Sequence, residues 1–578
     1  MRRILTAALA AFYVCATAAQ NLDTTRYIFP VRQVAGMFAA NFGEIRTGHF
    51  HAGVDIKTDG TEGKPLVAVA DGYVSRAVIT TYGYGKAIYL TLADGTTAVY
   101  GHLQRFRDDI DDYMQAERYR TRSNEIDRWF TPDRWPVKRG EVIGHSGNSG
   151  SSMGPHLHFE LREAGTGRRL NTVRQGIFRP ADKLPPRILR LHYVEVDTVQ
   201  GVCLRSRPAS YNLVREAEGR YKTTRREPIP VGRKGYFIVE VTDRRNDVNN
   251  TFGIWRLSAT VDGEPHFEYR MDGFLPSQAR YSDAVSWYAR QRDSRNEVIR
   301  MARLTGAPKA FYPVLREQGI IRTDSGQVRV IHIEAEDDCG NRSTLTFNIR
   351  GQSESFQAQA DSTALILRPD HSNSIALGRR LTANIPAGAL YEACHCRPDT
   401  LDKPNIDSLQ GIVVLSPAVR ILDAGIPLHK EATVTLHTEI PRTLRLRTML
   451  ASYTPENRKI ASIGGTCTGR TVTARTRKTG WLVAVADTLP PHIRPRFTKK
   501  SDLARAESLR FTVTDNFSGV ASGTLHIDGR WMPCDRLPMR NLFVHRFDTK
   551  PERRKHRIHF TATDAAGNTT VWEGEFFR

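Results

Sequence analysis

The chain is 578 residues long, which is too long for one domain and favours about three to five. It carries 83 basic and 62 acidic residues, which give a net charge of +21 at pH 7. No nucleic-acid-binding motif accompanies this charge, and the six cysteines that follow Cys15 are too few for a disulfide framework in so long a chain. The composition therefore favours a basic multidomain protein without a nucleic-acid partner.

The N-terminus reads as a secretory signal over residues 1–19. Arg2 and Arg3 precede an apolar run, and the small residues at 16–19 suit a cleavage site. The apolar run is too short to span a bilayer, and no later segment approaches transmembrane length. We therefore expect an exported protein of the periplasm or cell envelope, with no transmembrane segment after signal removal. There, a basic surface favours anionic envelope material, such as peptidoglycan carboxylates or lipid phosphates.

Residues 20–186 read as a β-rich domain. The Asp-Gly pairs at 71–72 and 94–95 both follow apolar runs, and Asp-Gly between such runs indicates a β-hairpin. The second hairpin would deliver His102 at the end of its returning strand, where a site residue is expected.

Two further motifs flank that histidine in the sequence. His51 precedes Asp55 by four residues, and His156 precedes His158 by two. If 155–161 is a strand, His156 and His158 share one face of it. Two imidazoles and one carboxylate are a sufficient set for a catalytic zinc site whose fourth position stays open.

Taken in order, these motifs resemble the lysostaphin/LytM-type zinc metallopeptidases, which cut peptide bonds in bacterial peptidoglycan. His51 and Asp55 fit the H-x-x-x-D pair of that family, His102 fits its lone histidine before a leucine, and His156 and His158 fit its H-x-H after a glycine-rich run. The resemblance covers roughly residues 27–164. It implies an antiparallel β-sheet peptidase domain and a Zn²⁺ ion held by His51, Asp55 and His158. It also implies that His102 and His156 are the catalytic pair that handles protons at a zinc-bound water, with the split of roles open.

Alternatives remain within the motifs. His49 competes with His51 as a ligand because both lie on one face of a strand, but only His51 has the family spacing to Asp55. His49 is then expected in the cleft wall, and His145 in a loop near the site mouth. The non-catalytic alternatives are a site that only holds zinc and a site whose histidines only form hydrogen bonds.

Other classes of function stay open for the whole chain. It could act as an envelope-binding or assembly scaffold, because most of its mass lies outside the motifs. It could also be a secreted protease acting on proteins, with the same chemistry. No H-E-x-x-H and no G-x-S-x-G motif lies near these histidines, so other hydrolase designs are not favoured.

Residues 105–133 interrupt the β pattern with apolar residues at helical spacing among many charges. We expect a helical insert here, either packed on the edge of the sheet or forming a wall or lid of the cleft.

The rest of the chain predicts short strands, which makes the fold mainly β. Residues 187–355 and 490–578 share a repeat that includes Val-Thr-Asp and a later Asp-x-x-Gly-Asn, and they resemble Ig-like β-sandwich domains. The first copy carries an insertion around 266–325 with an expected helix near 282–303. Residues 360–486 are expected to form a further β-rich domain.

Overall fold

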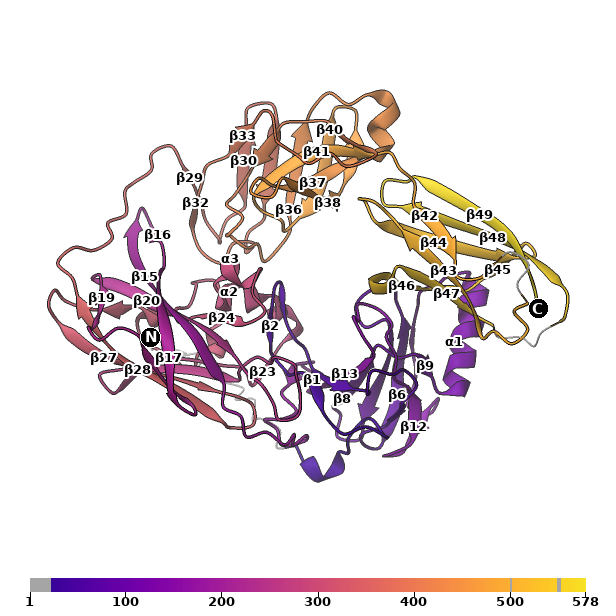
Figure 1. The fold of residues 1–578 in the computed structure, drawn as a ribbon, viewed down its shortest axis with the longest axis horizontal. Coiled ribbons are helices and arrows are strands. Elements are labelled where there is room, and N and C mark those ends of the chain that lie inside the picture. The colour runs from indigo at the N-terminus through magenta and orange to yellow at the C-terminus, as the bar shows by residue number, and fades with distance from the viewer. Residues whose placement is uncertain (1–21, 499–501, 548–551) are drawn as a thin grey trace, which may run out of the picture.

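The computed structural model describes residues 22–498, 502–547 and 552–578, so the expected secretion signal lies outside it. Figure 1 shows units that follow one another around a ring, with strands as the main element in each. The expectation of a mainly β chain is confirmed. Within the part of the chain that the structure describes, no helix is both long and apolar enough to cross a bilayer.

The N-terminal unit, residues 22–186, is built on an antiparallel sheet. The main strands lie in the order β1 (Phe38–Ala40), β4 (Val54–Lys57), β13 (His156–Arg162), β8 (Thr97–Gly101), β7 (Lys86–Leu92), β6 (Gly72–Ile79) and β10 (Ile126–Trp129). Leu157, Phe159 and Leu161 of β13 are buried in the core below the sheet. Because alternate residues of a strand share a face, the histidines of β13 face the other side.

One of the two expected hairpins is confirmed. β7 and β8 pair directly across the turn at 94–95, where Gly95 has φ +83°. The hairpin expected at 71–72 is wrong, because β5 (Pro65–Val67) pairs with β12 (Val142–His145) and β6 pairs with β7. Gly72 has no positive φ, and a Cβ there would lie 2.3 Å from the carbonyl oxygen of Thr91. This glycine serves close strand packing rather than a turn.

The expected helical insert contains β9 (Arg105–Phe106) and then α1 (Asp108–Thr121). Three aspartates lie in the first turn of α1, where negative charge is favourable, and the helix ends at Arg122 in the left-handed conformation. Ile110, Met114 and Arg118 are the buried residues of the helix. The helix therefore packs along the edge of the N-terminal unit.

The second unit, residues 187–355, shares its hydrophobic core with the first. Phe274 of β23 (Gly273–Phe274) packs against Phe42 and Phe50, with ring centroids 5.4 and 5.6 Å apart. The unit is centred on a large sheet, whose main strands lie in the order β24 (Glu297–Arg300), β20 (Lys234–Thr242), β15 (Arg187–Val199), β17 (Ala209–Ala217), β18 (Arg220–Thr223), β28 (Arg342–Gly351), β27 (Val328–Glu336), β21 (Arg256–Val261), β22 (Glu264–Arg270) and β25 (Val314–Leu315).

The single helix expected near 282–303 is wrong. Two four-residue helices, α2 (Ser282–Val285) and α3 (Tyr288–Gln291), precede strand β24. Val298 and Ile299 are buried where β24 pairs with β20, so tertiary pairing of β-branched residues outweighs the local helical pattern.

The third unit, residues 360–486, has two main sheets. One contains β30 (Asn373–Leu377), β31 (Leu381–Ile385), β36 (Ala432–His437), β40 (Thr471–Thr476) and β39 (Thr466–Thr468); the other contains β33 (Asp399–Leu401), β35 (Ala418–Arg420), β41 (Trp481–Asp487), β37 (Thr448–Thr454) and β38 (Lys459–Gly464).

The C-terminal unit, residues 490–578, is a sandwich of two four-stranded sheets. One contains β42 (His492–Pro495), β43 (Ser508–Thr514), β47 (Leu542–Arg546) and β46 (Asp535–Leu537); the other contains β45 (Arg530–Met532), β44 (Val520–Ile527), β48 (Lys555–Asp564) and β49 (Thr569–Phe577). Phe511 and Phe560 stack between them at 4.4 Å. The Ig-like relationship remains a prediction, and we propose the expected limits of all four units as the domain organisation.

The C-terminal sandwich docks on the N-terminal unit, beside α1 (Figure 1). Asp535 of β46 forms ion pairs with Lys86 of β7 at 2.8 Å and with Arg118 of α1 at 2.9 Å. The backbone N–H of Cys534 donates to the side chain of Asn124 at 2.8 Å. Burial acts to raise the pKa of Asp535, but the two cations outweigh it and hold that pKa below its ordinary value. The insert is thus a docking surface.

Candidate functional site

Strand register brings the three candidate motifs together. His158 of β13 lies directly opposite Asp55 of β4 on one side and opposite Gly101 of β8 on the other. His102 follows Gly101 immediately, and His51 precedes β4 by three residues. Residues that are about a hundred positions apart in sequence therefore meet on one face of the sheet.

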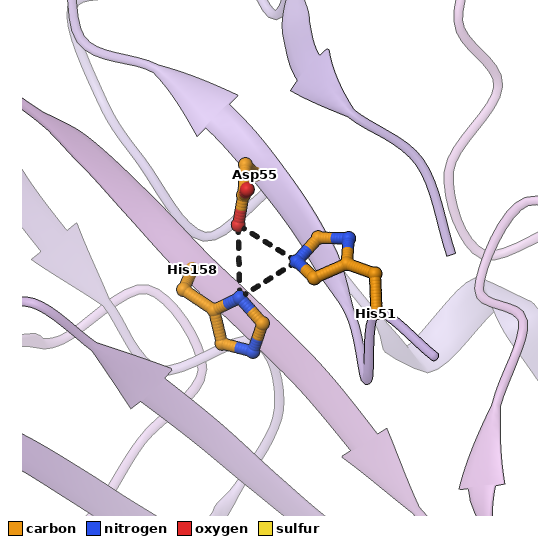
Figure 2. A group of neighbouring side chains, drawn as sticks. All are labelled: His51, Asp55 and His158. Atoms are coloured by element: carbon orange, nitrogen blue, oxygen red, sulfur yellow. Dashed lines mark hydrogen bonds and ion pairs between the residues drawn. The ribbon is translucent and has the colours of Figure 1, made fainter. Parts of the chain in front are cut away.

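His51, Asp55 and His158 form a tight triangle of ligand atoms (Figure 2). Oδ1 of Asp55 lies 2.8 Å from Nδ1 of His158 and 3.1 Å from Nε2 of His51. The two nitrogens are themselves 3.1 Å apart. Ligands about 2.0–2.2 Å from a tetrahedral metal lie about 3.3 Å from one another, so the triangle has nearly the required size.

Hydrogen bonds on the outer side of the triangle fix which nitrogen of each imidazole faces inward. Nδ1–H of His51 donates to the carbonyl oxygen of Asn41 at 2.7 Å. Nε2–H of His158 donates to Glu160 at 3.0 Å. Each ring thereby turns its other nitrogen toward Asp55, as outer partners of metal-binding histidines do. Two nitrogen lone pairs and a carboxylate oxygen converge, and this donor set fits a zinc ion.

Electrostatics also prepare the triangle for a cation. Burial acts to raise the pKa of Asp55, but the surrounding histidines outweigh it and hold that pKa well below its ordinary value. Burial, and then Arg46, lower the pKa of His51. For His158, burial acts to lower the pKa, but the hydrogen bonds to Asp55 and Glu160 outweigh it and raise the pKa to about 9. A metal therefore competes with one proton, the one on His158.

His102 and His156 stand beside the triangle in matching orientations. Nδ1–H of His102 donates to the carbonyl oxygen of Ser149, and Nδ1–H of His156 donates to that of Gly154, both at 2.8 Å. Nε2 of His156 lies 3.6 Å from Oδ1 of Asp55. The ring centroids of His102 and His156 are 4.8 Å apart. The Nδ1–H bonds leave Nε2 as the unprotonated nitrogen of each ring, and Nε2 of His156 lies near the triangle.

The backbone at His102 is in a conformation that L-residues rarely adopt. Its φ is +65°, and its N–H donates to the carbonyl oxygen of Tyr84 at 2.8 Å. Such residues cost of order 1–3 kcal/mol and cluster at functional sites. Burial, followed by the neighbouring His156 and His158, lowers the pKa of His102 to about 3. The ring is therefore neutral at physiological pH.

All five candidate residues line one cleft of about 840 Å³. His49 lines it too, as expected for a wall residue, whereas His145 lies in β12 and is not among the lining residues. Asn250 of the second unit completes one wall, and its side chain donates to the carbonyl oxygen of Ala39 at 3.0 Å. No residue of the 105–133 insert lines this cleft among those described.

Sequence reasoning missed the residues that orient the triangle. Glu160 accepts from His158, from Arg162 at 2.8 Å and from the hydroxyl of Tyr84. Arg46 lies 3.5 Å from Oδ2 of Asp55. The signal for Glu160 was present, because it follows His158 by two residues and so shares its strand face. Nothing local in the sequence pointed to Asn41 or Arg46.

Comparison with known proteins matches the part of the chain that holds this site. The model of Peptidase family M23 matches residues 49–119 and 115–171. DD-carboxypeptidase/endopeptidase Mpg of Neisseria meningitidis serogroup B is 33% identical over 118 residues, which are 20% of this chain and 21% of Mpg. Glycyl-glycine endopeptidase ALE-1 of Staphylococcus capitis is 33% identical over 114 residues, which are 20% of this chain and 25% of ALE-1.

Among solved structures, a mutant of the catalytic domain of the prophage-encoded M23 protein EnpA from Enterococcus faecalis is 27% identical. The match covers 25% of this chain and 92% of that domain, with a TM-score of 0.19. The chain spans about a fifth to a quarter of the length of the two curated relatives named above. The residues that the family model matches, 49–171, all lie in the N-terminal unit.

Proposed function

Since the chain carries a peptidase family M23 domain in its N-terminal unit, we propose that it is a zinc metallo-endopeptidase that hydrolyses peptide bonds in peptidoglycan. The observation that carries the proposal is the convergence of the three ligand atoms of His51, Asp55 and His158 in an open cleft. His102 and His156 line the same cleft, and their Nδ1–H bonds leave Nε2 of each ring to accept a proton. A scaffold would have no need of this complete set.

The roles follow from the contacts of each side chain. His51, Asp55 and His158 would hold the ion, and a zinc ion bound there would supply Lewis-acid chemistry toward a carbonyl and a water. Nε2 of His102 and Nε2 of His156 accept a proton from the attacking water and return one to the leaving amine. The Nδ1 hydrogen bonds to Ser149 and Gly154 keep both rings in the tautomer that this transfer requires. Glu160 and Asn41 hold the two ligand imidazoles in place.

Two features support peptidoglycan as the substrate, together with the M23 resemblance. The net charge of +21 favours an anionic polymer, whose carboxylates a basic surface concentrates electrostatically. The cleft is wide, and its wall comes from two units, so a branched peptide has room beside the triangle. We place this activity outside the cytoplasm, in the periplasm or cell envelope.

The test compares purified cell-wall sacculi with a panel of folded and unfolded proteins, using the zinc-loaded chain. We expect release of soluble fragments from sacculi with new amino termini, and little cleavage of the proteins. The Asp55→Ala variant, which loses the anionic ligand, is the inactive control. Cleavage confined to proteins would favour the secreted protease instead. Tight binding to sacculi without new termini would favour a scaffold.

A further inference from the structure

Two clusters of three aspartates lie outside the cleft, one in each of the two repeated units. The first triad is Asp182, Asp243 and Asp337; the second triad is Asp487, Asp515 and Asp564. In each triad one carboxylate oxygen from every member lies within 4.8 Å of the others. Like charges at such distances repel strongly unless something neutralises them.

The two triads occupy equivalent positions. Asp182 and Asp487 both open the sequence Asp-x-Leu-Pro-Pro, which leads into the first strand of each sandwich. Asp243 and Asp515 both end Val-Thr-Asp, directly after β20 and β43. The third members, Asp337 after β27 and Asp564 at the end of β48, both precede an asparagine by four residues. The same three-part arrangement of a linker and two loops therefore occurs twice.

The two triads also share a pattern of hydrogen bonds. Asn341 donates from its backbone to Oδ1 of Asp337 at 2.9 Å and from its side chain to Oδ2 at 2.8 Å. Asn568 makes the same two bonds to Asp564, at 2.8 Å each. These bonds hold one carboxylate of each triad in a fixed orientation. The repeated fixing of a buried acidic group indicates a built site rather than a chance cluster.

Buried oxygens in both triads lack partners among the residues that the structure describes. Asp243 is 0% exposed, and neither of its carboxylate oxygens has a hydrogen-bond partner; Oδ2 of Asp182 is also buried and unpartnered. In the second triad, Oδ2 of Asp515 accepts from two backbone N–H groups, whereas Oδ1 is buried without a partner. Leaving such oxygens dry and unpaired costs free energy. A cation held by each triad would satisfy them.

Near the first triad one cation, Arg245, acts on Asp182, but it is already paired with a fourth aspartate. Arg245 reaches Asp338 with two contacts of 2.6 and 2.8 Å, so this pair is neutral as a whole. Phe517 and Ala565 occupy the equivalent positions in the other repeat and carry no charge. Three acidic groups thus remain in each triad. Burial, and then the neighbouring Asp337 and Asp182, raise the pKa of Asp243 to about 9, so a proton is the competitor of a bound cation there.

We propose that each triad binds one Ca²⁺ ion, which ties the linker that enters the sandwich to two loops at the end of that sandwich. The donors are carboxylate oxygens alone, which suit a hard cation, and calcium accepts the irregular oxygen cages that loops provide. The ion would fix the second unit relative to the first, and the C-terminal unit relative to the third. This inference concerns sites separate from the cleft and does not depend on the proposed peptidase activity.

The test titrates calcium into the full, zinc-loaded chain by calorimetry, after calcium has been removed by dialysis. We expect two ions per chain, with Kd values of about 10⁻³ M or tighter. Asp243→Asn and Asp515→Asn should each lose one ion, and the double variant both. Asp262→Asn and Asp528→Asn are matched controls, because they alter equivalent turn residues outside the triads and should keep both ions.

Thermal unfolding gives an independent readout. Calcium should raise the Tm of the native chain and of both controls, and should leave the Tm of the double variant unchanged. Because Asn keeps the size and shape of Asp and adds no charge, the variants should fold without calcium. Absence of binding at 10 mM calcium would overturn the proposal, and so would unchanged binding in the double variant. Tighter binding of Mg²⁺ than of Ca²⁺ would overturn the assignment to calcium.

Discussion

At the scale of single residues, interatomic distances separate the three proposed ligands from the two proposed proton carriers. The inward nitrogens of His51 and His158 lie 3.1 and 2.8 Å from Asp55, whereas Nε2 of His156 lies 3.6 Å away. The ring centroid of His102 lies 5.9 Å from that of His158, against 5.0 Å for the ring of His51. These distances place two histidines in the triangle and two beside it.

This separation predicts two classes of variant. Asp55→Ala and His158→Ala should lose zinc, because each removes one corner of the triangle. His102→Ala and His156→Ala should keep one zinc per chain and lose about 10²–10⁴-fold in rate, the usual contribution of general acid–base catalysis. Metal analysis and initial rates on the same preparations make the check. Loss of zinc from His156→Ala as complete as that from His158→Ala would show that a ligand had been mistaken for a catalytic group.

The proton on His158 predicts a pH dependence for metal binding. In the metal-free chain the pKa of His158 is about 9, so below that pH zinc must displace one proton. Zinc affinity should therefore rise about tenfold per pH unit between pH 7 and 8.5, and level off above about pH 9. His51 adds nothing to this slope because its pKa is lowered. Calorimetry in buffers of different ionisation enthalpy should count about one proton released per zinc, and a count near zero would contradict the raised pKa.

At the scale of elements, the pairing of β4 with β13 depends on a glycine in the first motif. A Cβ at Gly53 would lie 2.1 Å from the carbonyl oxygen of Phe159, so only glycine lets these strands approach. We expect Gly53→Ala to push β4 away from β13, to lower the Tm and to weaken zinc binding at least tenfold. Gly154→Ala is the control, because a Cβ there meets nothing within 4 Å and its φ is not positive. Equal zinc affinity in both variants would show that the close pairing of β4 with β13 does not determine zinc binding.

Period-two alternation and turn chemistry were enough to predict the β-rich class, the hairpin that delivers His102 and the shared face of His156 and His158. These features are local, so the sequence carries them directly. The pairing of β5 with β12 was not predictable in the same way, because it joins segments about 75 residues apart and no local pattern encodes the partner. The missed contacts of Asn41 and Arg46 are of the same kind, since both depend on a fold that brings distant loops together.

The insert shows what a local pattern leaves out. Its pattern predicted a helix packed on the sheet edge or a wall or lid of the cleft, but not that Arg118, only 2% exposed, pairs with a carboxylate of the C-terminal unit. A sequence shows that a cation lies on a helix, but it does not show that the partner is some 400 residues away.

At the scale of the whole molecule, the docked C-terminal unit predicts a specific failure. Asp535→Asn would leave Lys86 and Arg118 buried without their anion, and breaking a buried pair in this way costs about 3–5 kcal/mol. We expect the sandwich to undock, with a larger radius of gyration in X-ray scattering and faster proteolysis of the linkers. Glu573→Gln makes the same change of charge on the exposed face of the same unit and should change neither readout. A compact Asp535→Asn chain would show that the remaining contacts suffice.

Undocking should also affect the cleft, because two hydrogen bonds connect Lys86 to His102. The backbone N–H of Lys86 donates to Oγ of Ser149 at 2.9 Å, and the carbonyl oxygen of Ser149 holds His102. The position of one proposed proton carrier is thus tied to a contact made by the most distant unit of the chain.

That contact has a consequence for the order in which the protein is made. Asn124 and Cys534, which bond across the docked face, are separated by 410 residues. If the chain between them were a flexible coil, closing it would cost about 5 kcal/mol by the logarithmic law of loop closure. Folded units in between lower that cost by holding the ends near one another in advance. In a nascent chain, the docking face of the N-terminal unit is therefore still exposed to solvent. It is covered only after the last strands have been synthesised and every intervening unit has folded.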